Sequence, residues 1–182
     1  GYTRFFNFLK TCLRRLMGHR SIPSGRTEER KMAFKNPWIR KLWLYLAILD
    51  LIFVYGLYIR ICRMVGYVVI ADRYLIDTWI DFRLNFPDEE IDHWILWKLL
   101  DWITPKPDVA FLLLIEVEEC LLRSELKNEP FPDSDEVLRK RIFLYESLAD
   151  QMCVIDCMRP IDVICDEIIT CVSNENKHSV RA

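Results

Sequence analysis

Three residues with side chains suited to phosphate chemistry, Asp72, Arg73 and Tyr74, directly follow an apolar run at residues 68–71. A short apolar run bounded by polar residues is typical of a buried strand in a parallel sheet. Open α/β sheets bind ligands at the carboxyl ends of such strands, so these side chains are expected at a ligand site. A carboxylate there can hold magnesium and its waters, and a guanidinium can bind a phosphate. The sequence therefore predicts a nucleotide phosphate site at this strand end.

A helix is expected directly after this site, because apolar residues at positions 75, 76, 79 and 80 recur at helical spacing. Asp77, Asp81 and Arg83 would share the polar side of this helix. A helix that leaves the carboxyl end of a strand would line a substrate cleft. Asp77 and Asp81 are therefore candidates for binding the hydroxyl groups of an acceptor, and exposure to water is the alternative.

The elements that must position these residues alternate between strands and helices. Two further short apolar runs, the second closed by Asp156, predict strands at residues 109–115 and 152–155. Apolar residues at helical spacing predict helices at residues 5–17, 38–64, 75–83, 88–102, 116–126, 134–150 and 160–172. Asp88 and Ser134 are expected to cap two of them, and a polar tail is expected after Ser173. This alternation predicts an α/β fold, a parallel sheet flanked by helices with right-handed crossovers.

One stretch is apolar enough to cross a membrane. Between Leu42 and Ile59 the only charged residue is Asp50, and the run is flanked by Arg40, Lys41, Arg60 and Arg63. A central aspartate would cost about 2.5–3.5 kcal/mol in a membrane. Gly66 then ends the helix and a strand is expected at once, as in an α/β unit. We therefore favour a helix that packs on the sheet and on a partner subunit, with a membrane anchor as the alternative.

The composition is that of one folded domain of 182 residues. Hydrophobic residues make up 52% of the chain and the net charge is -2, which excludes a disordered chain and any bulk attraction to nucleic acid. The seven cysteines are odd in number and include no Cys-x-x-Cys pair, and the three histidines are scattered along the chain, so a zinc site is not indicated. This pattern favours reduced thiols in a cytoplasmic protein. No secretory signal is visible, and a start at Gly1-Tyr2 favours a fragment whose beginning lies upstream.

The stretch Gly25-Arg26-Thr27 faintly resembles the end of a phosphate-binding P-loop. The P-loop lysine is replaced by an arginine, and Arg20 stands where the first glycine of that motif would fall. No apolar strand precedes the stretch, so an ordinary loop is expected here.

The order of these motifs resembles the thymidylate kinase family of P-loop kinases. The motifs are Val-Val-Ile-Ala-Asp-Arg-Tyr after an apolar helix and a glycine, then Pro-Lys-Pro-Asp before an apolar strand, then an arginine-bearing helix, a loop, Leu-Tyr-Glu-Ser-Leu-Ala and Val-Ile-Asp. The chain is most similar to the divergent thymidylate kinase-like branch, which has Asp-Thr and a second aspartate after Asp-Arg-Tyr. The match covers roughly residues 37–172 of a single domain spanning residues 1–182.

The resemblance implies transfer of a phosphoryl group from ATP to dTMP, with magnesium, by a cytoplasmic homodimer. Asp72 would organise magnesium, through water where it does not bind directly, and Arg73 would bind the acceptor phosphate beside Tyr74, Asp77 and Asp81. Arg123 and Lys127 would approach the transferring group at the lid. Arg139 and Arg141 are weaker candidates for that role, with a solvated surface as the favoured alternative. Phosphoryl transfer needs such groups because it depends on positioning and charge stabilisation.

The chain departs from the family pattern in two ways. The first strand and the P-loop are absent, so the ATP β- and γ-phosphates would have no backbone cradle and no lysine. We therefore expect this fragment to be inactive alone, an expectation that ATP turnover by the purified chain would contradict. Asp81 stands where dTMP-specific enzymes usually have an aromatic residue, so the acceptor could be a related monophosphate. A degenerate, non-catalytic kinase-like binding module and a membrane-anchored protein are the alternatives.

Overall fold

The computed structural model describes residues 32, 34–128 and 132–179. The helix expected at residues 5–17 and the loop at Gly25-Arg26-Thr27 lie outside the described residues. The chain divides into two compact units. The first contains the described part of residues 1–75 together with residues 88–105, and the second contains residues 76–87 and the described part of residues 106–182.

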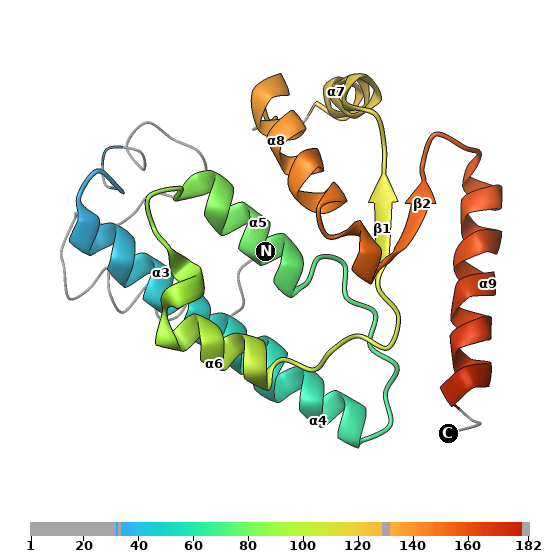
Figure 1. The fold of residues 1–182 in the computed structure, drawn as a ribbon, viewed down its shortest axis with the longest axis horizontal. Helices are drawn as coiled ribbons and strands as arrows, with labels where there is room; N and C mark the ends of the chain where they lie inside the picture. Colours follow the sequence, from blue (N-terminus) through green and yellow to red (C-terminus); the bar gives the residue numbers. More distant parts are fainter. Residues whose placement is uncertain (1–31, 33, 129–131, 180–182) are drawn as a thin grey trace. The chain divides into compact units, whose positions relative to one another are not determined.

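The first unit is built around one continuous helix, Pro37–Met64, of 28 residues (Figure 1). It comprises α3 (Pro37–Leu51), a π-helical turn (Ile52–Tyr58) and α4 (Ile59–Met64). The side chain of Asn36 caps its start by accepting a hydrogen bond of 3.0 Å from the backbone N–H of Trp38. Gly66, two residues past its end, has a φ of 90°, which favours glycine. The expected helix and both of its boundaries are confirmed.

Helix α6 (Ile95–Ile103) packs along this long helix within the first unit (Figure 1). Leu44 and Ile48 of α3 are fully buried, as is Leu100 of α6. The closest approach is at Gly56, where an added Cβ would lie 2.7 Å from the Cγ2 atom of Ile103. A residue without a side chain is therefore required at position 56 for the two helices to meet.

The helix expected at residues 88–102 begins later than the sequence pattern predicts. A 3₁₀ turn (Ile91–His93) comes first, and Trp94 is an extended residue before α6. Glu89, expected in the first helical turn, is buried instead and pairs with Arg40 of α3, with 2.7 Å between Oε1 and Nε. Ile95 and Trp102 of α6 are 85% and 78% exposed.

The expectation of a strand at residues 68–71 is wrong. Residues 67–71 have no regular secondary structure, and Val68 and Ile70 are 90% and 92% exposed. A strand needs a neighbour for its N–H and C=O groups. The described residues supply no such partner, because the only strands they contain pair with each other.

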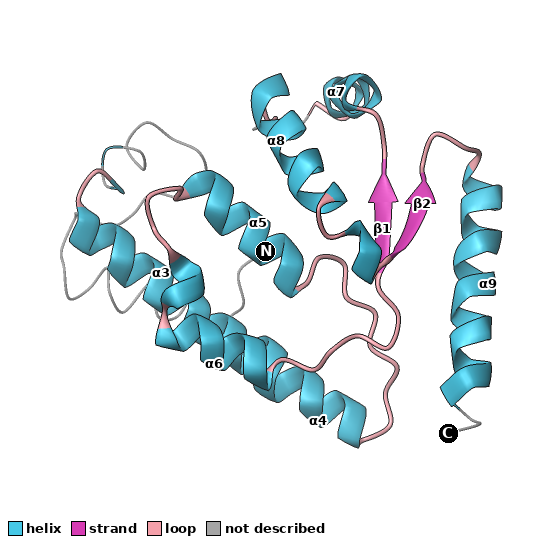
Figure 2. Ribbon diagram, viewed as in Figure 1, coloured by secondary structure: helices cyan, strands magenta, loops and turns pink. Residues whose placement is uncertain are grey.

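The second unit contains a two-stranded parallel sheet with helices (Figure 2). Strand β1 (Phe111–Leu114) pairs with β2 (Cys153–Asp156), in register from Phe111 opposite Cys153 to Leu114 opposite Asp156. Helices α7 (Val117–Leu126) and α8 (Asp135–Glu146) and a 3₁₀ turn (Ala149–Gln151) form the crossover. Two of the three expected strands are confirmed as a parallel pair, and the larger sheet stays a prediction.

The other helices of the second unit are α5 (Leu75–Asn85), whose first residue belongs to the first unit, and α9 (Ile161–Ser179). Ser134 caps α8 as expected, accepting a hydrogen bond from the N–H of Val137. Helix α8 ends at Glu146 rather than near residue 150. Helix α9 continues to Ser179, so the expectation that the last helix ends near residue 172 is wrong.

Candidate functional site

Asp72 and Arg73 lie in a bend between the irregular segment at residues 67–71 and α5. Both residues are exposed, and neither side chain forms a hydrogen bond or ion pair with the described residues. The expectation that they stand at the end of a buried strand is therefore wrong, because that strand does not form. The backbone of Arg73 has a φ of 66°. This left-handed conformation costs a residue other than glycine about 1–3 kcal/mol, and such strain is concentrated at functional sites.

Tyr74 anchors this bend to Pro105, the last residue of the first unit and the first of the Pro-Lys-Pro sequence. Its Oη donates a hydrogen bond of 2.9 Å to the carbonyl oxygen of Pro105. Its ring lies 4.7 Å from that of Tyr55, measured between centroids. The pKa of Tyr74 is raised, mainly by burial and to a smaller extent by the neighbouring Tyr55, while the positive charges of Arg63 and Arg60 act to lower it. The two motifs on which the family resemblance depends are thus joined by a direct hydrogen bond.

Two arginines that the sequence reasoning treated only as flanking charges lie beside Tyr74. Arg60 and Arg63 line a shallow cavity of about 290 Å³ together with Met64 and Pro105. The Nε of Arg60 donates to the carbonyl oxygen of Ile103 at 2.9 Å, which fixes the guanidinium at this position. Their three-residue spacing places both arginines on one face of α4, and this signal could have revealed them. This end of the first unit can therefore attract an anion.

Asp77 and Asp81 bind side chains of α8 within the second unit. They lie one helical turn apart on α5 and so share a face. The Oη of Tyr145 donates to Oδ1 of Asp77 at 2.5 Å, and Nη1 of Arg141 donates to Oδ1 of Asp81 at 2.5 Å. Arg141 also pairs with Asp133 at 3.2 Å. The two carboxylates that the sequence assigned to an acceptor or to water therefore hold α8 against α5.

The electrostatics of this cluster follow from its burial. Burial, then the hydrogen bond with Asp77, raises the pKa of the Tyr145 hydroxyl well above its ordinary value. Burial alone would lower the pKa of Arg141, but its pairing with Asp81 and then Asp133 outweighs burial and raises this pKa. The side chain of Arg141 is only 15% exposed, so the favoured expectation of a solvated residue is wrong here.

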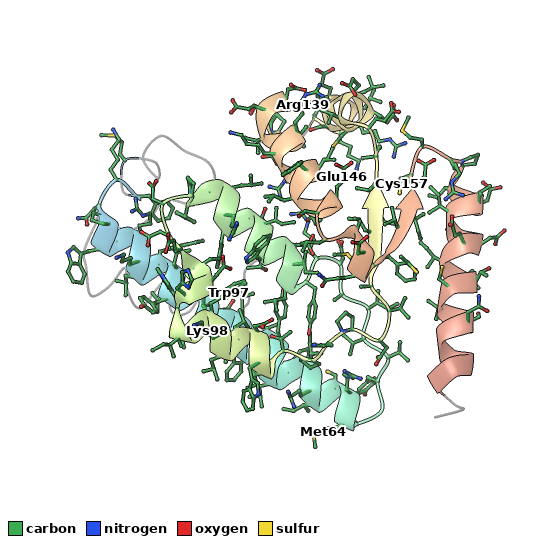
Figure 3. The ribbon with its side chains drawn as sticks, in the orientation of Figure 1. Met64, Trp97, Lys98, Arg139, Glu146 and Cys157 are labelled. Atoms are coloured by element: carbon green, nitrogen blue, oxygen red, sulfur yellow. The ribbon has the colours of Figure 1, made fainter. Side chains whose placement is uncertain are left out.

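Arg123 and Lys127, the residues expected at the lid, lie at the C-terminal end of α7. The Nε of Arg123 donates to Glu119 at 2.7 Å, and Nη2 donates to the carbonyl oxygen of Cys157 at 3.4 Å. Cys157 directly follows β2, so Arg123 lies at the carboxyl edge of the sheet. Lys127 is the exposed residue at the end of α7. Arg139 pairs with Asp135 and Glu118 on the surface, as expected of a solvated residue (Figure 3).

No three His, Cys, Asp or Glu residues within the described part of the chain are grouped so as to hold a metal ion. Magnesium is commonly bound by one or two carboxylates together with waters and substrate phosphates. The exposed carboxylate of Asp72 fits that pattern, and its role as a magnesium ligand stays a prediction.

Comparison of the chain with family models, with curated proteins and with solved structures gives no match. The similarity to thymidylate kinases consequently stays a prediction from the residues quoted above.

Proposed function

We propose that this chain is part of a thymidylate kinase-like phosphotransferase that transfers a phosphoryl group from ATP to dTMP or a related nucleoside monophosphate. The observation that carries the proposal is the hydrogen bond from Tyr74 to the carbonyl oxygen of Pro105. It joins residues 31 positions apart and holds the Asp-Arg-Tyr motif against Pro105, where the Pro-Lys-Pro sequence begins. A contact between the two motifs supports a shared role for them.

Arg73 is the residue that would bind the acceptor phosphate. Its side chain is exposed and makes no ion pair with the described residues, so its guanidinium is available to a ligand. Tyr74 fixes the backbone next to it, which supports a role for Tyr74 in positioning Arg73 rather than in touching the acceptor. Asp72 would organise magnesium between the two phosphate-bearing substrates.

The remaining assigned residues divide into two kinds. Arg123 and Lys127 would stabilise charge on the transferring phosphoryl group, which is the usual contribution of cations in this chemistry. Asp77 and Asp81 are better suited to a different task, because both accept hydrogen bonds from α8. They would hold this helix and the loop before it in place. ATP binding through a P-loop, a cytoplasmic location and a homodimer complete the proposal as predictions from the resemblance.

Isothermal titration calorimetry of the 182-residue chain with dTMP and other nucleoside monophosphates tests the role of Arg73. A hydrogen bond to a charged group contributes about 1.5–3 kcal/mol, so Arg73→Ala should weaken binding by roughly ten- to a hundred-fold. Lys98→Ala, an exposed cation on α6 of the same unit, is the control and should bind normally. Equal affinities for Arg73→Ala and the unsubstituted chain would refute the assignment.

A second candidate is a kinase-like module that binds nucleotides without catalysis. The specific observation in its favour is that Arg123, a proposed catalytic cation, already pairs with Glu119. Such a module would show the same dependence of binding on Arg73. It would differ in giving no ATP-dependent phosphorylation of any monophosphate in a longer form of the protein that carries a P-loop.

A further inference from the structure

The long helix of the first unit carries a row of exposed apolar side chains on the side away from its buried residues. The row is formed by Leu42, Tyr45, Leu49, Phe53, Leu57 and Ile61, with Trp38 and Met64 at its two ends. Trp38 and Met64 are 82% and 86% exposed, and Met64 points away from the end of α4 (Figure 3). We refer to these eight residues as the apolar stripe.

The π-helical turn at Ile52–Tyr58 keeps the apolar stripe on one side. Members of the stripe are three or four residues apart, but from Leu49 to Ile61 every interval is four. In an α-helix each four-residue step turns the stripe by about 40°, and repeated steps would carry it around the helix. A π-helix closes hydrogen bonds over one more residue, so it absorbs this rotation. The helix is thus built to present one continuous apolar surface.

The other side of the same helix is also apolar and is covered by α6, through residues such as Leu44, Ile48 and Gly56. A helix that is apolar all round is normally covered all round. Monomeric soluble proteins rarely expose contiguous apolar patches larger than roughly a few hundred Å². The apolar stripe follows a helix of 28 residues, which is about 42 Å long. The apolar stripe therefore needs an occupant.

The charges around the apolar stripe indicate which occupant fits. Lys41 lies near one end of the helix, and Arg60 and Arg63 lie near the other. No exposed residue of the helix itself is acidic, because its one acid, Asp50, is buried. A second copy of this helix would bring like charges together in either direction of pairing. An anionic lipid surface would instead attract both ends. The exposed aromatic residues Trp38 and Tyr58 near the two ends are typical of a membrane interface.

We propose that the apolar stripe docks on an anionic lipid surface, with the helix lying in the plane of the membrane. The covered side of the helix carries the buried Asp50 and the ion pair of Arg40 with Glu89, and α6 lies along it. Polar groups such as these are costly within a membrane, so the helix lies on the lipid rather than crossing it. This inference is independent of the phosphotransferase proposal and concerns where the protein is held.

Vesicle flotation of the 182-residue chain tests the proposal, with vesicles that contain phosphatidylglycerol compared with phosphatidylcholine alone. The chain should float with the anionic vesicles, and Leu49→Glu and Leu57→Glu should each lower this partitioning by about tenfold. Leu122→Glu, a substitution of a half-exposed leucine on α7, is the control and should partition normally. Circular dichroism confirms that each variant is folded, and Ile61→Glu replaces any variant that is not.

The contribution of charge is tested separately. Lys41→Gln should lower partitioning onto anionic vesicles by about fivefold, the effect of about 1 kcal/mol per basic residue, and Lys140→Gln on α8 should not. Failure of the unsubstituted chain to float overturns the proposal. It is also overturned if the chain without lipid is a dimer by sedimentation velocity and Leu57→Glu makes it a monomer, because a second copy then covers the apolar stripe.

Discussion

Replacing Arg141 tests whether the cluster between α5 and α8 holds the second unit together. Arg141→Met keeps most of the side-chain volume but leaves Asp81 and Asp133 without their shared cation. Removing one partner of a buried ion pair typically costs 3–5 kcal/mol. Because the Asp81 side chain is 36% exposed, water partly compensates it, and we expect the low end, about 3 kcal/mol.

The assay is thermal unfolding followed by circular dichroism. A loss of about 3 kcal/mol should lower the Tm by roughly 6–12 °C in a chain of this size. Arg139→Met is the matched control, since Arg139 lies on the same helix but its ion pairs are on the surface. Its Tm should be nearly unchanged. Equal melting temperatures for the two variants would refute the conclusion that the Arg141 pairs hold α8 against α5.

Three further predictions follow from single contacts. The stability of the chain should fall above about pH 10, because the raised pKa of Tyr145 means that the folded state keeps a proton that the unfolded state loses above the ordinary value of 10.0. Denaturant titrations at pH 9 and pH 11, roughly on either side of that value, should show this loss, and Tyr145→Phe should reduce it. Gly56→Ala should destabilise the chain by about 1–3 kcal/mol in urea unfolding, because the new Cβ would meet Cγ2 of Ile103, and Ile103→Ala in the same chain should relieve the clash. Tyr74→Phe should cost about 1 kcal/mol by the same measurement and should weaken dTMP binding in calorimetry, since the bond to Pro105 is lost; unchanged binding would separate Tyr74 from the acceptor site.

The features that the sequence predicts well are those set by residues close together in the chain. The helix that begins at Pro37 has its cap in Asn36 and its end marked by Gly66, and each signal lies within two residues of the boundary it sets. The cap at Ser134 is equally local. The apolar runs predict strands at residues 109–115 and 152–155, and the strands form at residues 111–114 and 153–156. Their parallel pairing is the arrangement that an intervening helical crossover favours.

The features that the sequence misses depend on distant partners. The apolar run at residues 68–71 has strand composition, but no described strand pairs with it. Helix α6 begins later than the sequence pattern predicts, because Glu89 pairs with Arg40, 49 residues away, instead of entering a helix. The sequence favours a solvated position for Arg141, because its partner Asp81 lies 60 positions earlier in the chain. Helical spacing alone could not show that α5 faces α8 at this point.

The bend at Arg73 and the cluster around Arg141 lie in different units of the chain. Their contributions to ligand binding and to stability can therefore be measured independently. The bend at Arg73 is held within the first unit by Tyr74, whereas Arg141 makes its contacts within the second. Distant sites without shared partners usually have additive effects. Arg141→Met should therefore lower the Tm and leave dTMP affinity unchanged at temperatures where the chain is folded, and Arg73→Ala should do the reverse. A loss of dTMP affinity in folded Arg141→Met would instead show that Asp81, freed of its cation, belongs to the acceptor site as the sequence pattern predicts.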